Sequence, residues 1–171
     1  GFLFMLLFGI GWAKPVPINT RNFKNPRVGM ALSGIAGPIS NLLLGLLGMI
    51  LSVVTMVICY LAGIDPDTNV WITVLLLFLD VLAFMNVALA VFNLIPVPPF
   101  DGSRFAYVFL PTKWYFKVMQ YERFTGIAIM IIIFILSRIG LNPISIVVYF
   151  ILDNTMDLLV LIANAFLNLI L

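Results

Sequence analysis

Long apolar stretches separated by short polar segments organise this chain. The stretches at 39–61 and 70–92 carry almost no charge. At about 1.5 Å per residue, each is long enough to cross a hydrocarbon core of roughly 30 Å as a helix. The stretch at 124–141 predicts a further, rather short span. Polar residues interrupt 144–171, so the pattern leaves open whether this part forms one distorted span or two packed pieces.

The overall composition agrees with a membrane protein. Hydrophobic residues make up 63% of the chain and charged residues only 9%, whereas roughly 25% are charged in soluble domains. No strand-length alternation of polar and apolar residues recurs. We therefore predict an all-α, polytopic transmembrane helix bundle with a partly extended proline-rich loop. Residues 1–171 should form a single membrane-embedded domain.

Polar and small residues inside the apolar stretches predict how the spans pack. Pro38 should divide 28–62 into a short lead-in helix and a crossing at 39–61. Residues that would let a neighbouring helix approach closely recur every three or four positions: Gly34, Gly37, Asn41, Gly45, Gly48, Ser52 and Thr55. A carboxylate at Asp80, midway along 70–92, is predicted to have a structural or interfacial role, such as pairing with a neighbouring helix.

The placement of the charges predicts the topology. Basic residues gather in two segments: Lys14, Arg21, Lys24 and Arg27 in one, and Arg104, Lys113, Lys117 and Arg123 in the other. In the turn at 63–69 between the two crossings, the only charged residues are Asp65 and Asp67. Two crossings put both basic segments on one side, and the positive-inside rule makes that side cytoplasmic. Because each basic cluster is small and flanks a span, no nucleic-acid partner is predicted.

The segment 93–104 carries the chemistry. It reads Asn-Leu-Ile-Pro-Val-Pro-Pro-Phe-Asp-Gly-Ser-Arg and places an amide, prolines and a carboxylate at the end of an apolar helix. A carboxylate at that depth is a candidate functional residue. The residues alone also allow simpler roles. Asp101 is a favoured N-cap for a following helix, with Arg104 as its ion-pair partner. The Asn93 amide can bond free backbone carbonyls, and Gly102 suits a turn.

This segment closely resembles the Asn-Leu-x-Pro-x-Pro-Pro-x-Asp-Gly motif of the site-2 protease family, the intramembrane zinc metalloproteases. Gly-Trp-Ala-Lys-Pro at 11–15 and Ala-Gly-Pro at 36–38 add weaker support, and the latter gives Asn41 a minor functional possibility. The resemblance implies that Asp101 is a Zn²⁺ ligand and that Asn93 orients or stabilises the oxyanion during peptide-bond hydrolysis. It also implies a transmembrane protein substrate, a lipid-bilayer setting and a bacterial cell membrane.

The absence of histidine is the main departure from that family. The family's other two zinc ligands belong to an upstream His-Glu-x-x-His motif, whereas this chain has no histidine. Glu122 has no histidine beside it and is not a substitute. The apolar residues 2–9 are too few to cross a membrane, so we expect the chain to begin partway through a span and to be a C-terminal fragment. Without the histidine motif, this fragment should be inactive alone. A non-catalytic membrane protein is the alternative, and a transporter is less favoured because no repeat is apparent.

Overall fold

The computed structural model describes residues 23–97, 100–111, 114, 117 and 120–170. Its main helices are α2 (Pro26–Ala62), α3 (Val70–Asn93), α4 (Asp101–Ala106), α6 (Glu122–Arg138) and α7 (Pro143–Ile170), with short 3-10 turns η2 (Pro66–Thr68) and η3 (Tyr107–Phe109). The described residues contain no strand. In them, α2, α3 and α7 are long and apolar enough to cross a membrane. The predicted all-α, membrane-spanning fold is confirmed.

Local hydrogen bonds explain where α2 begins and ends. The Asn25 side chain accepts from the backbone N–H groups of Arg27 and Val28 at 3.2 and 3.4 Å, and a proline follows at the first helical position. Such a cap satisfies donors that have no partner inside the helix. At the other end, Gly63 adopts a left-handed conformation with φ 65°. The Ile64 N–H then bonds the Cys59 carbonyl at 2.9 Å, which closes the helix.

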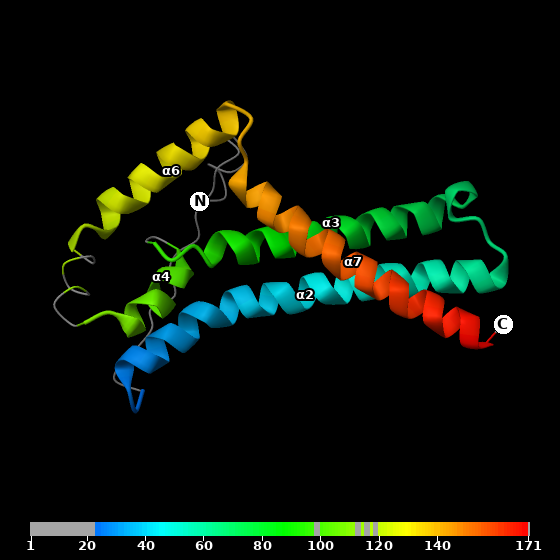
Figure 1. Cartoon of the computed structure of the whole chain (residues 1–171), viewed down its shortest axis with the longest axis horizontal. Helices are drawn as coiled ribbons and strands as arrows, with labels where there is room; N and C mark the ends of the chain where they lie inside the picture. The colour runs from blue at the N-terminus through cyan, green and yellow to red at the C-terminus, as the bar shows by residue number, and fades with distance from the viewer. Residues whose placement is uncertain (1–22, 98–99, 112–113, 115–116, 118–119, 171) are drawn as a thin grey trace.

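The predicted break at Pro38 is wrong. Pro38 lies inside α2, which continues from Pro26 to Ala62, and its ring is buried. Proline removes one backbone donor, but unwinding a whole turn would expose several unpaired groups where no water can satisfy them. The continuous helix is therefore the less costly arrangement. Figure 1 shows α2 bending in its blue N-terminal part without a break.

The helices α2 and α3 form an antiparallel pair joined through η2 (Figure 1). An added Cβ at Gly45 would lie 2.9 Å from Val87 Cγ2, and one at Gly48 would lie 3.1 Å from the Leu79 carbonyl oxygen. The predicted close approach along the small-residue face is therefore confirmed at these positions. Gly37 differs, because it is exposed and an added Cβ would meet nothing within 4 Å.

Helix α7 crosses over the pair formed by α2 and α3 (orange to red in Figure 1). It is one continuous helix, so this part of the chain forms a single long helix and not two separate pieces. Two of its polar side chains bond carbonyls of the same helix. Asn154 Nδ2 donates to the Phe150 carbonyl at 2.6 Å, and Thr155 Oγ1 donates to the Ile151 carbonyl at 2.7 Å.

Helix α6 stands apart from the other described helices (Figure 1). Its 17 residues extend for about 26 Å, slightly less than the roughly 30 Å hydrocarbon core. The Arg138 guanidinium lies over the Phe134 ring, 5.2 Å from its centroid. The predicted short span at 124–141 thus forms a helix, and its crossing of the membrane stays a prediction. Of the proline-containing polar segment at 13–27, residues 13–22 lie outside the described residues.

Candidate metal-ligand site at the end of α3

The proline motif begins where α3 ends. Asn93 is the last residue of α3, and the Leu94 N–H still bonds the Ala90 carbonyl at 2.9 Å. The chain then bends at Pro96, and Phe100 lies beside the end of α3 again. The Phe100 ring is buried and packs edge-on against the Phe92 ring, with 4.5 Å between centroids. This aromatic contact fixes the returning chain beside the end of α3.

Asp101 is the first residue of α4. The N-cap position belongs to Phe100, whose side chain makes no capping bond, so the simpler interpretation of Asp101 as an N-cap is wrong. Asp101 Oδ1 lies 3.8 Å from Arg104 Nη1, and 42% of the Asp101 side-chain surface is exposed. An exposed pair at this separation stabilises little. The carboxylate therefore has its predicted partner, and its exposed surface still leaves room for it to bind a metal ion.

The short helix α4 is held closely against the end of α3. A Cβ at Gly102 would collide with the carbonyl group of Leu94, so only glycine allows this approach. Ser103 is 3% exposed, and its Oγ donates to the Phe100 carbonyl at 2.7 Å. The sequence suggested a turn at Gly102, whereas the structure shows a helical residue whose missing side chain brings two backbones together.

Asn93 lies partly buried one residue before this turn. Its side-chain amide makes no hydrogen bond within the described part of the chain. The alternative in which it bonds free backbone carbonyls is therefore not seen there. Asn86, two turns earlier on the same face of α3, differs because its Nδ2 donates to the Leu82 carbonyl at 2.8 Å.

The described residues provide one candidate zinc ligand rather than a complete set. No group of three or more His, Cys, Asp or Glu residues among them lies close enough to hold a metal ion. Zinc in a catalytic site takes three protein ligands and keeps one position open. The accessible Asp101 carboxylate fits one of these ligands. The other two would have to come from outside the described chain.

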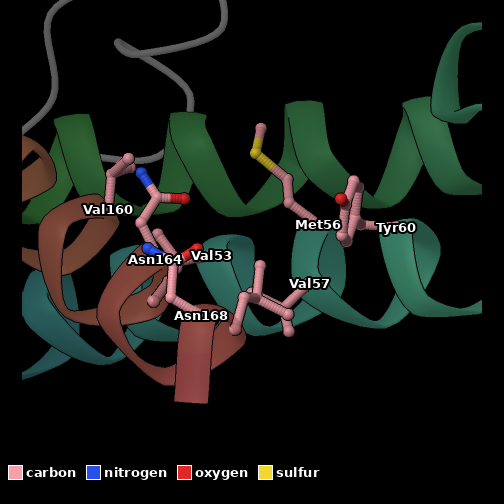
Figure 2. Close-up of a pocket in the computed structure, with 9 residues that line it drawn as sticks. Val53, Met56, Val57, Tyr60, Val160, Asn164 and Asn168 are labelled. Atoms are coloured by element: carbon pink, nitrogen blue, oxygen red, sulfur yellow. The ribbon is translucent and has the colours of Figure 1, made fainter. Parts of the chain in front are cut away.

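Two further polar features lie away from Asp101. Ser52 is fully buried in α2, and its Oγ donates to Asp80 Oδ1 of α3 at 3.2 Å, which is the pairing between helices expected for Asp80. A cavity of about 620 Å³ is lined by residues of α2 and α7 (Figure 2): Val53, Met56, Val57, Tyr60, Val160, Ala163, Asn164, Leu167 and Asn168. Gly34, which contacts α4, lies about 28 Å along α2 from Val53. The cavity is therefore separate from the candidate site.

Comparison with known proteins decides the family. The sequence profile of Peptidase family M50 matches residues 19–139, which include the proline motif and Asp101. This chain belongs to Peptidase family M50. It is 34% identical over 141 residues to a protein of Bacillus subtilis (strain 168) named "Putative zinc metalloprotease YwhC". That alignment covers 79% of this chain and 59% of the relative. No solved structure matches the chain.

Membership of M50 confirms the resemblance to site-2 proteases that the motif indicated. The match also agrees with the membrane-spanning helices, because M50 is a family of membrane-embedded metalloproteases. This M50 chain is an integral membrane protein by its family and by the length and composition of its helices. It spans 59% of the Bacillus relative.

Proposed function

We propose that this chain is the C-terminal part of an intramembrane zinc metalloendopeptidase and that Asp101 supplies one of its zinc ligands. The observation that carries the proposal is the position of Asp101. The chain of an M50 member leaves a membrane-spanning helix, bends back, and presents an accessible carboxylate at the end of that helix. A hard oxygen ligand of this kind suits zinc together with two imidazoles. The two histidines would come from a His-Glu-x-x-His segment outside these residues.

The residues of the chain would have separate tasks in peptide-bond hydrolysis. When bound, zinc supplies Lewis-acid chemistry and activates water for hydrolysis. Asp101 would bind and orient the metal. The Asn93 amide, which has no described hydrogen-bond partner, would donate to the oxygen on which negative charge develops. Asn93 is therefore the proposed catalytic residue of this chain.

The proposed substrate is a membrane-embedded segment of another protein. The M50 family and the apolar helices support this substrate class. The Bacillus relative supports a bacterial cell membrane. The charge pattern supports an orientation in which the basic segments, including Lys24 and Lys117, face the cytoplasm. Asp101 would then act near the cytoplasmic membrane face.

Asp101→Asn in the protein as its gene encodes it tests the ligand assignment. The change keeps the size of the side chain and removes the negative charge that zinc requires. We expect loss of zinc and at least a 100-fold loss of cleavage of a reporter transmembrane substrate, with membrane insertion and protein level nearly unchanged. Zinc content, protein level and cleavage are measured together.

Asp67→Asn is the matched control, because Asp67 is exposed in the turn at the opposite end of the α2–α3 pair. It should retain normal zinc and cleavage. Normal zinc and cleavage in Asp101→Asn would refute the ligand assignment. A gene that encodes no His-Glu-x-x-His upstream of these residues would favour the non-catalytic membrane protein instead.

A further inference from the structure

We infer that Gly34 is a positioning residue for Asp101. Because Gly34 has no side chain, the first turn of α4 packs directly against α2, and this contact fixes where the Asp101 carboxylate lies. This inference rests on the proposed function, because it assigns the geometry of the zinc ligand to a contact with a different helix. Gly34 is buried in α2 and lies 67 positions before Asp101 in the sequence.

The contact at Gly34 is made by parts of α4 that cannot easily move aside. An added Cβ would lie 2.8 Å from the backbone carbonyl oxygen of Asp101 and 3.0 Å from Arg104 Cβ. Neither atom is the free end of a flexible side chain. Even one methyl group at position 34 must therefore shift the backbone of α4 relative to α2.

The helix α4 is packed just as closely where it contacts α3. Gly102 already brings α4 against the carbonyl group of Leu94 at the end of α3, where a Cβ would collide. The first turn of α4 is thus held by two glycine contacts, one with α2 and one with α3. A push from position 34 would move or tilt this turn, and the Asp101 carboxylate would move with it.

The other glycines of α2 contact different partners. The atoms nearest to an added Cβ at Gly48 belong to Leu79 and Ala83, which are both residues of α3. Gly37, one turn after Gly34, is exposed, and an added Cβ there would meet nothing within 4 Å. The structure therefore separates helix packing at Gly48 from positioning of the ligand at Gly34.

Metal ligation is sensitive to shifts of this size. Zinc–ligand distances fall within about 0.2 Å of their ideal values, and supporting groups that orient a ligand affect metal affinity by roughly 10–100-fold. We therefore expect Gly34→Ala to weaken zinc binding by roughly 10–100-fold, although the residue touches no metal.

The test uses the protein as its gene encodes it, with Gly34→Ala, Gly37→Ala and Gly48→Ala compared with the unmodified protein. Zinc affinity is measured by titration with a competing chelator. The visible absorption of the Co²⁺-substituted protein reports ligand geometry, and thermal unfolding of the metal-free protein reports stability. Gly34→Ala should lower zinc affinity and alter the Co²⁺ absorption. Gly48→Ala should lower stability but keep affinity and absorption. Gly37→Ala should keep affinity and absorption and should not lower stability.

Gly34→Ala with unchanged zinc affinity and Co²⁺ absorption would overturn the inference. Equal loss of affinity in Gly34→Ala and Gly48→Ala would also overturn it, since general packing would then explain both. If Gly34→Ala accumulates poorly, it is measured in the Gly37→Ala background, where the exposed alanine strengthens α2. Asp101→Asn separates the two proposals: retention of zinc there refutes the ligand assignment, whereas loss of zinc there with a normal Gly34→Ala refutes only the role of Gly34.

Discussion

At the scale of single residues, two asparagines of α3 use their side chains differently. Asn86 donates to the Leu82 carbonyl of its own helix at 2.8 Å. Asn93 ends the helix beside the proline motif, and its side chain makes no hydrogen bond within the described residues. We propose that this amide, which has no partner among the described residues, serves a substrate instead. This difference favours Asn93 as the donor that stabilises negative charge during hydrolysis.

Asn93→Ala is expected to lower kcat roughly 100-fold while zinc content stays normal, because an oxyanion donor acts in the transition state and binds no metal. Steady-state cleavage of a reporter transmembrane substrate and zinc analysis check this. Asn86→Ala is the matched control and should retain most of the activity. Loss of zinc in Asn93→Ala would instead assign the residue a role in the structure of the metal site.

At the scale of elements, contact between α2 and α3 depends on small residues. Gly45 faces Val87 and the Ala83 carbonyl, with an added Cβ only 2.9 Å from Val87 Cγ2. Ala83, Val87 and Ala90 are almost fully buried on the facing side of α3. Without a hydrophobic driving force between helices in lipid, such close contact is what holds the pair together.

Gly45→Leu should force the two helices apart and destabilise the protein by about 1–3 kcal/mol, as overpacking does. Protein level and thermal unfolding in detergent measure the effect, and activity should fall in parallel with stability. Gly37→Leu adds the same side chain to an exposed position of α2 and should be tolerated. Equal stability of the two variants would show that contact at Gly45 does not hold the pair.

At the scale of the whole molecule, the described basic residues Lys24, Arg27 and Arg104 lie at the end of the α2–α3 pair where α2 begins and α4 packs, and the acidic turn at 63–69 lies at the other end (Figure 1). Cysteines introduced at Lys24 and Lys117 should be labelled only from the cytoplasmic side, and one at Asp67 only from outside. The Cys59→Ser background removes the native thiol, which is buried. Labelling of the cysteines at positions 24 and 117 from opposite sides would contradict the proposed two crossings.

The isolated 171-residue polypeptide should not retain stoichiometric zinc after purification. Its described residues contain no group of three metal ligands, and the chain has no histidine. One carboxylate cannot replace the three protein ligands of a catalytic site. Metal analysis of the purified monomer checks this expectation. Tight zinc at one ion per chain would show that the chain contains a complete site.

The sequence by itself determined the helical class, the family and the candidate ligand. Long apolar stretches must satisfy their backbone groups internally in lipid, so they predict helices without knowledge of their neighbours. The proline–aspartate motif likewise indicated the M50 family from a few adjacent residues. The interval between Gly45, Gly48 and Ser52 predicted the face that α2 packs against α3, because helical periodicity is local.

Only the tertiary structure decided which elements meet and which local preference prevails. Pro38 favours a break, but the cost of unpaired backbone in the membrane keeps α2 continuous. Asp101 suits an N-cap, but the contact of Phe100 with Phe92 places Phe100 at that position. The contact of α4 with Gly34 joins residues far apart in sequence. Such a contact depends on how α2, α3 and α4 are arranged in space, which periodicity along one helix does not specify.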